Sequence, residues 1–253
     1  MTGWEIAGYL ACVAIAIATQ CLTGFALALV LLGLTSLFEL APLADVANVA
    51  TVLSLANAAI ALRGPKRHVD GPILRSTAIG TVFGVAAGVV LLAWLSTNVV
   101  MGLRLLLGVV VIACAIVVLR QVEPLPQRSS PASFGVIGVL SGILGGLFSA
   151  SGPPLVWQFY RQPISLDTLR DTLVAVFAVG GLLRLVMVVP AGQFSANSLL
   201  LCVLGVPLAM VVTWWMKRHP PDWPRAAVLK LVCALLVLTG VGLVGPAVLA
   251  LVH

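Results

Sequence analysis

Long apolar stretches dominate this chain, and their length determines the class of fold it can adopt. A helix that crosses the roughly 30 Å hydrocarbon core of a bilayer needs about 20 apolar residues. Six stretches match that length, at residues 43–62, 76–96, 99–119, 171–190, 197–216 and 226–249. Only 9% of the 253 residues are charged, whereas a soluble domain has roughly a quarter. The sequence therefore predicts an all-α polytopic membrane protein.

Two further apolar stretches, 6–37 and 132–160, are too long for one ordinary crossing and too short for two. The first is interrupted at residues 20–24, and the second at Gly145-Gly146 and again at 149–154, which ends in two prolines. Glycine weakens a helix and proline removes a backbone donor, so we expect both segments to break. Irregular backbone at membrane depth persists only where protein or a water-filled cavity covers it.

The chain also repeats itself at a constant offset of 121 residues. The matched positions are Gly24 with Gly145, Pro42 with Pro163, Thr51 with Thr172, Arg63 with Arg184, Gly84 with Gly205, Trp94 with Trp215, Arg104 with Arg225, and Val111 with Val232. Matches of Trp, Arg, Pro and Gly at one offset are much less expected by chance than matches of Val or Ala. We interpret them as an internal duplication, with repeats at 1–122 and 129–253 that form a single membrane domain.

The distribution of basic residues predicts how the two repeats are oriented. If each broken segment enters and returns on the same side, twelve of the fourteen Lys and Arg residues share one side. If each broken segment crosses the membrane once, seven Lys and Arg residues lie on each side. The positive-inside rule favours the first arrangement and places the basic side in the cytoplasm. The repeats are then inverted, each with one broken re-entrant segment plus three transmembrane helices.

Inverted repeats with paired broken helices indicate an alternating-access transporter, and the exposed N-termini of half-helices favour an anion. The residues at the breaks are small and uncharged, and we expect them to bind the substrate: Gln20, Thr23, Gly24, Gly145, Gly146, Ser149, Ser151 and Gly152. They can donate hydrogen bonds to an oxyanion without a buried Lys or Arg, and they lack the carboxylates that a dehydrated cation needs. The alternative is that the glycines only permit close helix packing.

Polar residues within the spans extend this predicted site. Asn48 and Thr51 belong to a polar stripe in the span 43–62, and Thr172 is the repeat counterpart of Thr51. Polar groups at membrane depth usually face the interior of the helix bundle. We expect these three residues to line the cavity, with ordinary interhelical hydrogen bonding as the alternative.

Arg170 and Asp171 lie about two turns inside the helix that contains the span 171–190. Two interpretations are open: a salt-bridged mouth that includes Asp167 and Arg161, or a gate that attracts anions.

Arg104 and Arg184 are the two basic residues left toward the outer side, about one to two helical turns from its face. Such a position suits either snorkelling toward water or steering of an incoming anion.

In several of these features the chain resembles the TauE/SafE family of bacterial membrane proteins. The features shared with the family are the first break, then Pro42, Asn48, Thr51 and Ser54, the loop ending in Val69-Asp70, Gly80, Gly84 and Gly88, and in the second half Gly142 to Gly146, Pro163, Thr172 and Gly205. The family's first break is usually richer in glycine than residues 20–26 are here. The resemblance implies export of sulfite or small organosulfonates across the cytoplasmic membrane, whereas composition and spacing alone predict only an anion.

Other classes of function have less support. His68 and His219 are in loops, His253 is terminal, and no two acids lie at catalytic spacing within a span, so we expect no enzyme. The five cysteines show no metal-binding spacing, and the basic residues lie in short loops, so we expect no metal, cofactor or nucleic acid. The expected partners are the lipid bilayer and a small anion. An anion channel and a transporter of another small organic anion are the alternatives. A coupling proton stays a hypothesis, because Asp171 is the only carboxylate well inside a predicted span.

Overall fold

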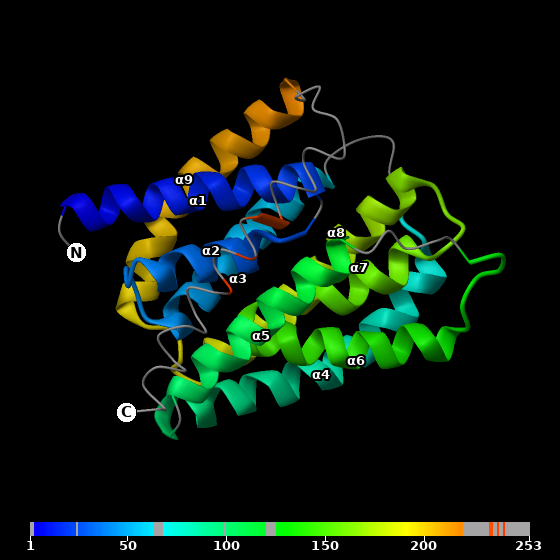
Figure 1. Cartoon of the computed structure of the whole chain (residues 1–253), viewed down its shortest axis with the longest axis horizontal. Helices are drawn as coiled ribbons and strands as arrows, with labels where there is room; N and C mark the ends of the chain where they lie inside the picture. The colour runs from blue at the N-terminus through cyan, green and yellow to red at the C-terminus, as the bar shows by residue number, and fades with distance from the viewer. Residues whose placement is uncertain are drawn as a thin grey trace.

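The structure of the chain is a computed structural model, shown in Figure 1. It describes residues 3–23, 25–62, 68–98, 100–119 and 125–219, and four further positions between 233 and 240. These residues form helices and no strand. Six of the helices are long and apolar enough to cross a membrane, so the chain is a multi-pass membrane protein. The predicted span 226–249 lies outside the described residues except for those four positions.

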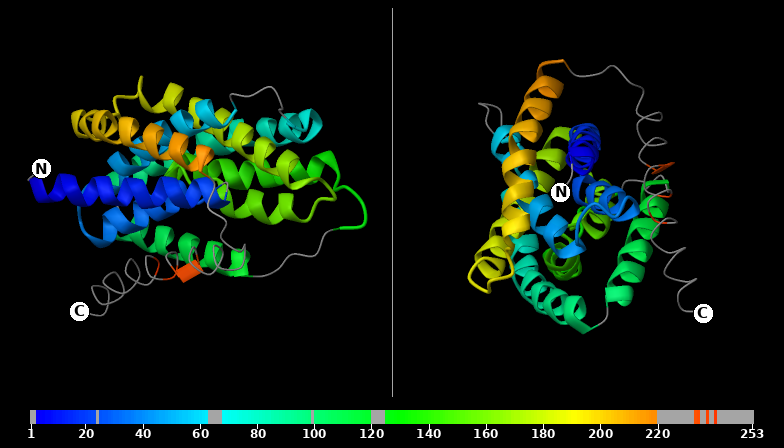
Figure 2. Two further views of the ribbon diagram at one scale, coloured as in Figure 1. Left: turned by 90° about the horizontal axis from the view of Figure 1, so that it is seen from above. Right: turned by 90° about the vertical axis from the view of Figure 1, so that its left-hand side faces the viewer.

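The helices run mostly alongside one another down the long axis of the molecule (Figures 1 and 2). In chain order they are α1 (Gly3–Thr23), α2 (Leu27–Leu37), α3 (Leu43–Ala61), α4 (Gly71–Asn98), α5 (Val100–Leu119), α6 (Pro131–Phe148), α7 (Gly152–Tyr160), α8 (Leu166–Val188) and α9 (Ala196–Arg218). Five of the predicted spans coincide with the helices α3, α4, α5, α8 and α9. Among the described residues, α5 has only a shorter apolar stretch, Leu105–Ile116, and the six helices long enough to cross are α1, α3, α4, α6, α8 and α9.

Both long apolar segments are broken, but the breaks are shorter than predicted. In the first segment Gln20 and Thr23 still belong to α1, and the helix resumes at Leu27. Ala26, just before α2, has a left-handed backbone with φ of 63°. The Thr23 hydroxyl donates to the Thr19 carbonyl oxygen (2.7 Å), one turn back in the same helix.

In the second segment the prediction that Gly145 and Gly146 interrupt the helix is wrong. Both lie inside α6, because a glycine costs a helix only about 1 kcal/mol and close packing offsets that cost. The break is Ser149 to Ser151, and Ser149 has φ of 55°. The two prolines occupy the first turn of α7, where a backbone N–H has no helical partner in any case.

Each broken segment forms a hairpin. A Cβ built on Gly8 would lie 3.6 Å from Leu40 Cδ1, so α1 begins near the place where α2 ends. In the second hairpin the Leu125 N–H donates to the Arg161 carbonyl oxygen (2.7 Å), which joins the start of α6 to the end of α7. The two hairpins open toward opposite ends of the molecule (Figure 1). The first arm of each, 21 residues in α1 and 18 in α6, is itself long and apolar enough to span a membrane.

Helices α4 and α6 pack closely through six glycines, here called the glycine seam: Gly80, Gly84, Gly88, Gly138, Gly142 and Gly146. A Cβ on Gly84 would come 2.2 Å from the Val139 carbonyl oxygen and 2.9 Å from Gly142 Cα. Small residues at intervals of four allow helix backbones to approach closely in a membrane. The packing alternative is therefore the correct interpretation for Gly146.

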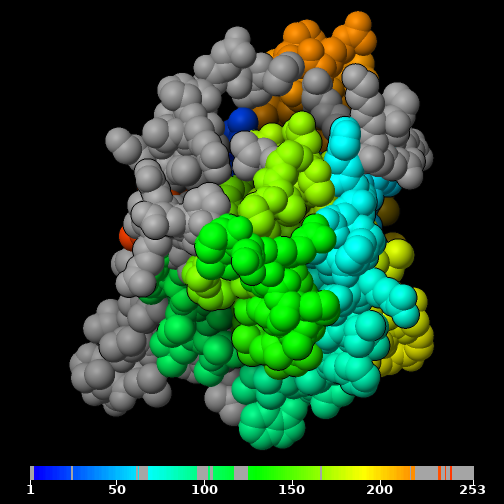
Figure 3. All heavy atoms as spheres, turned by 90° about the vertical axis from the view of Figure 1, so that its right-hand side faces the viewer, coloured from blue at the N-terminus to red at the C-terminus, as the bar shows by residue number. Residues whose placement is uncertain are grey.

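One end of the molecule, here called the basic end, is formed by the starts of α4, α6 and α8 and the end of α7 (Figures 1 and 3). It carries the basic side chains Arg75, Arg128, Arg161 and Arg170. Trp215, at the end of α9, is 54% exposed, and Trp94, which the sequence offset matches to it, is 57% exposed near the end of α4. Exposed tryptophans are typical of the two membrane interfaces.

Candidate functional site

A cavity of about 40 Å³ lies where the two breaks meet. A Cβ on Gly152 would lie 3.3 Å from the Phe25 ring, so the tips of the two hairpins are in contact. The lining includes five residues predicted from the sequence, Gln20, Gly145, Ser149, Ser151 and Gly152, and also Arg184. Residues beside both breaks therefore line one cavity.

Two helices begin at this cavity, and neither has a side-chain cap. α2 follows Ala26, and α7 follows Ser151. The first N–H groups of a helix have no partner within the helix and carry partial positive charge, which favours an anion. Ala26 and Ser149 also hold left-handed backbones at the cavity wall. Strain of this kind, of order 1–3 kcal/mol per residue, occurs most often at functional sites.

Arg184 of α8 is the charged group of the site. It is only 1% exposed, and its guanidinium contacts four oxygen atoms. Nε donates to the Gly146 carbonyl oxygen at 3.0 Å. Nη1 donates to Asn48 Oδ1 and Thr51 Oγ1, both at 2.9 Å, and lies 3.3 Å from the Ala47 carbonyl oxygen.

None of these four partners carries a charge, and among the residues described no carboxylate forms an ion pair with Arg184. Its Nη2 is buried without a hydrogen-bond partner. A buried charge is costly unless it is paired, so this guanidinium is electrostatically uncompensated among the described residues. For Arg184 the sequence left snorkelling or anion steering open, and the burial of the side chain rules out snorkelling toward water. The donors predicted at the breaks were all neutral, whereas the cavity lining also includes this guanidinium. The physical reason is that α8 turns Arg184 toward the polar stripe of α3.

Gln20 of α1 is the second unsatisfied residue at the cavity. Its side chain is 4% exposed, and Oε1 is buried with no hydrogen-bond partner. Gln20 Oε1 and Arg184 Nη2 are the two buried side-chain atoms of this kind found among the described residues, and both residues line the same cavity.

A second layer of polar residues holds Asn48 in place behind Arg184. Asn48 Nδ2 donates to the Gln193 carbonyl oxygen (2.9 Å) and to Ser198 Oγ (3.4 Å). Ser198 Oγ donates to Asp45 Oδ1 at 2.8 Å, and Ser195 Oγ donates to the same oxygen at 2.6 Å. Sequence analysis missed this layer, although an acid near the start of a span was a visible signal.

Thr51 and Ser149 complete the wall between α3 and the second break. Their hydroxyl oxygens are joined by a hydrogen bond of 3.0 Å. Thr51 therefore contacts both the guanidinium and the break, although it does not itself line the cavity. Asn48 and Thr51 were expected to line the cavity, and the structure instead places them directly behind it, as the groups that orient Arg184.

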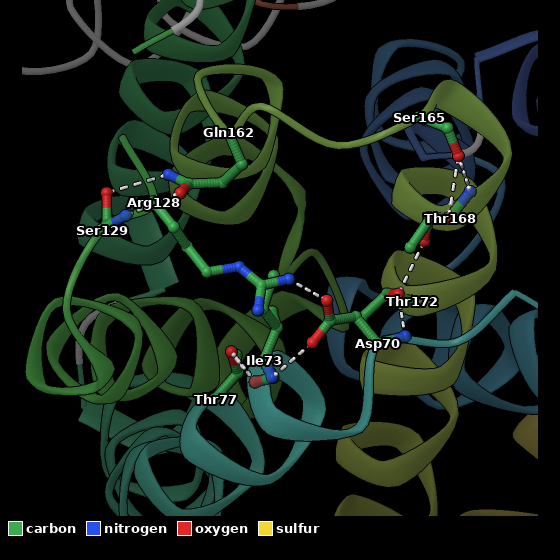
Figure 4. Close-up of polar contacts among 9 residues, drawn as sticks. All are labelled: Asp70, Ile73, Thr77, Arg128, Ser129, Gln162, Ser165, Thr168 and Thr172. Atoms are coloured by element: carbon green, nitrogen blue, oxygen red, sulfur yellow. Dashed lines mark hydrogen bonds and ion pairs between the residues drawn. The ribbon is translucent and has the colours of Figure 1, made fainter. Parts of the chain in front are cut away.

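Other predicted residues lie elsewhere. Thr172 is at the basic end, where its Oγ1 accepts the Asp70 N–H at 3.0 Å (Figure 4). Thr23 is buried at the end of α1 and is not part of the cavity lining. Gly24 lies outside the described residues, and so does the side chain of Arg104, whose backbone is part of α5.

The basic end has different contacts from the predicted salt-bridged mouth. The ion pair that the described residues form there joins Arg128 to Asp70 (Figure 4). The Asp171 carboxylate accepts the His68 N–H at 3.0 Å. Arg161 lies over the Trp157 ring at 4.4 Å, and Arg170 is exposed. Sequence analysis missed Arg128 and Asp70 as partners because 58 residues separate them.

The chain was compared with known proteins. Residues 9–243 match the family described as "Sulfite exporter TauE/SafE". The chain is 36% identical over 231 residues to a protein of Cupriavidus necator named "Probable sulfite/organosulfonate exporter TauE", covering 91% of this chain and 90% of that protein. No solved structure matches. Both matches confirm the prediction of a transporter rather than an enzyme. The extent of these matches shows that the chain belongs to the sulfite exporter TauE/SafE family.

Proposed function

We propose that this protein exports a small anion, sulfite or a small organosulfonate, across the inner membrane, and that the anion binds beside Arg184 in the central cavity. The observation that carries the proposal is the buried Arg184 guanidinium, which contacts only neutral oxygens and has a free Nη2. The two uncapped helix N-termini at the cavity favour the same sign of charge. The name of the Cupriavidus relative supports the substrate class.

We further propose that transport follows alternating access between inverted repeats. Two features support this mechanism. The hairpins open toward opposite ends, and each end has its own polar contact between residues of different repeats. At one end Ser198 of α9 donates to Asp45 of α3 (2.8 Å). At the basic end Thr172 of α8 accepts the N–H of Asp70, which directly precedes α4 (3.0 Å). In this mechanism the two contacts open in turn, so that the anion meets one side at a time.

The proposed binding site can be tested with Arg184→Met, which keeps side-chain length and removes the charge. Sulfite and methanesulfonate are titrated into purified wild type and variant by calorimetry. Loss of a buried charge partner costs about 2–5 kcal/mol, so affinity should fall at least about thirtyfold. Thermal unfolding should show a folded variant, because the substitution removes an unpaired buried charge. The matched control is Arg170→Gln, whose exposed guanidinium lies at the basic end. Equal affinity in Arg184→Met and wild type would disprove the site.

Orientation in the inner membrane is tested separately, in a variant without the five native cysteines. Gln127, exposed at the basic end, and Ala191, exposed just after α8, each receive a single cysteine. In intact cells an impermeant thiol reagent should label the cysteine at 191 and not that at 127. The reverse pattern would contradict export from the basic side. Single-channel currents in a bilayer would identify an anion channel instead of a carrier.

A further inference from the structure

The central cavity lacks two partners of opposite kind. Arg184 Nη2 can only donate a hydrogen bond, and Gln20 Oε1 can only accept one. A fully deprotonated oxyanion could satisfy the guanidinium but would face the Gln20 carbonyl oxygen with another lone pair. Leaving a buried acceptor unsatisfied costs about 1–3 kcal/mol. A ligand that satisfies both atoms therefore carries an anionic oxygen and a donor hydrogen.

The charge of the site also favours a singly charged anion. Arg184 supplies one positive charge, and among the described residues that line the cavity it is the only cationic side chain. A monoanion would be neutralised by this guanidinium. A dianion would retain a net negative charge in a buried site, where uncompensated charge is strongly disfavoured.

The size of the cavity limits the ligand further. A volume of about 40 Å³ corresponds to roughly three water molecules, since one water needs at least about 10–15 Å³ by this measure. A sulfur atom with three oxygens fits that space. The side chains of Phe25 and Phe177 form part of the wall.

Resting on the proposed function, we propose that Gln20 is a specificity-determining residue that selects hydrogen sulfite over the sulfite dianion. In this arrangement an anionic oxygen of hydrogen sulfite accepts from Arg184, and its hydroxyl group donates to Gln20 Oε1. The transported species is then the singly protonated monoanion.

The test compares hydrogen sulfite with methanesulfinate, which has a methyl group in the place of the hydroxyl and is also a monoanion. Both are titrated by calorimetry into the purified protein in a mildly acidic buffer, where sulfite is chiefly singly protonated. Wild type should bind hydrogen sulfite about tenfold more tightly, the value of one hydrogen bond to a buried acceptor. As the pH is raised, the affinity for sulfite should fall while that for methanesulfinate stays constant.

Two variants sharpen the comparison. Gln20→Met keeps the length of the side chain, removes the amide oxygen and should abolish the preference by weakening hydrogen sulfite alone. Ser54→Ala, a matched control on the wall of the same cavity, should leave the ratio of the two affinities unchanged. The wild-type ratio is informative even if a variant fails to fold. Equal binding of both anions by wild type would overturn the role of Gln20 and leave the Arg184 site standing, whereas binding of neither would overturn both proposals.

Discussion

Gly145 and Gly146 are neighbours in α6, yet they belong to two different regions of the molecule. A Cβ on Gly146 would lie 2.5 Å from the Val85 carbonyl oxygen, in the glycine seam. A Cβ on Gly145 would lie 2.3 Å from Ser151 Oγ, at the wall of the central cavity. Successive residues of a helix point about 100° apart, so one glycine faces the packed backbone of α4 and the other faces the break.

The difference shows that small residues serve the fold in one region and the site in the other. In the glycine seam the obstacle to a larger side chain is backbone, which cannot move without separating two helices. At the cavity the obstacle is a serine side chain, which can turn away. Substitutions in the seam should therefore affect stability, and substitutions at the cavity should affect binding.

The largest effect is expected for Gly146→Val. Its side chain would overlap backbone atoms of α4, and overpacking of this kind costs about 1–3 kcal/mol or more. The purified variant should aggregate or unfold at a clearly lower temperature, as measured by size-exclusion chromatography and thermal unfolding. Gly135→Ala is the control in the same helix, since its nearest atom, Ser76 O, is 3.9 Å away. Wild-type stability of Gly146→Val would mean that α4 and α6 are not closely packed.

Gly145→Val should abolish transport without the loss of stability expected for Gly146→Val. The valine would displace Ser151 and fill part of the cavity, so export should be abolished while the protein stays folded and inserted. Transport is measured in proteoliposomes, with the amount of inserted protein determined in parallel. If Gly145→Val unfolded as readily as Gly146→Val, the proposed division between seam and cavity would be wrong.

A smaller effect is expected for Ser151→Ala. Its hydroxyl lines the cavity, and one net hydrogen bond is worth about 1 kcal/mol, so affinity should fall roughly fivefold. The Ser151 carbonyl oxygen, which accepts from Ser141 Oγ at 2.7 Å, is retained in the variant. Stability should therefore stay near that of wild type. Unchanged calorimetric affinity would exclude the Ser151 hydroxyl as a ligand.

Arg170→Gln should have the smallest effect on affinity. This exposed guanidinium at the basic end acts through its long-range field, which salt screens. Uptake from the basic side should slow at low ionic strength and approach the wild-type rate at high ionic strength. Initial rates measured over a salt series check this, and a change in affinity that persists at high salt would contradict a steering role.

Much of the fold could be predicted from the sequence, because it depends on local properties. Length and hydropathy determined the helices, and proline and small polar residues determined that two segments break. These features are set by the residues within one segment, so no knowledge of the neighbouring helices was needed.

The site required the tertiary structure. The sequence placed Arg184 toward an outer face and Thr172 at the centre, whereas the structure buries Arg184 against Asn48 and Thr51 and leaves Thr172 beside Asp70. The repeat offset predicts which residues correspond, but not which helix lies opposite each face. Arg184 and Asn48 are 136 residues apart, and only the packing of α8 against α3 brings them together. The sequence alone determined that this protein lies in a membrane and has two broken helices, and the long-range packing of α8 against α3 decided where the buried Arg184 guanidinium would sit.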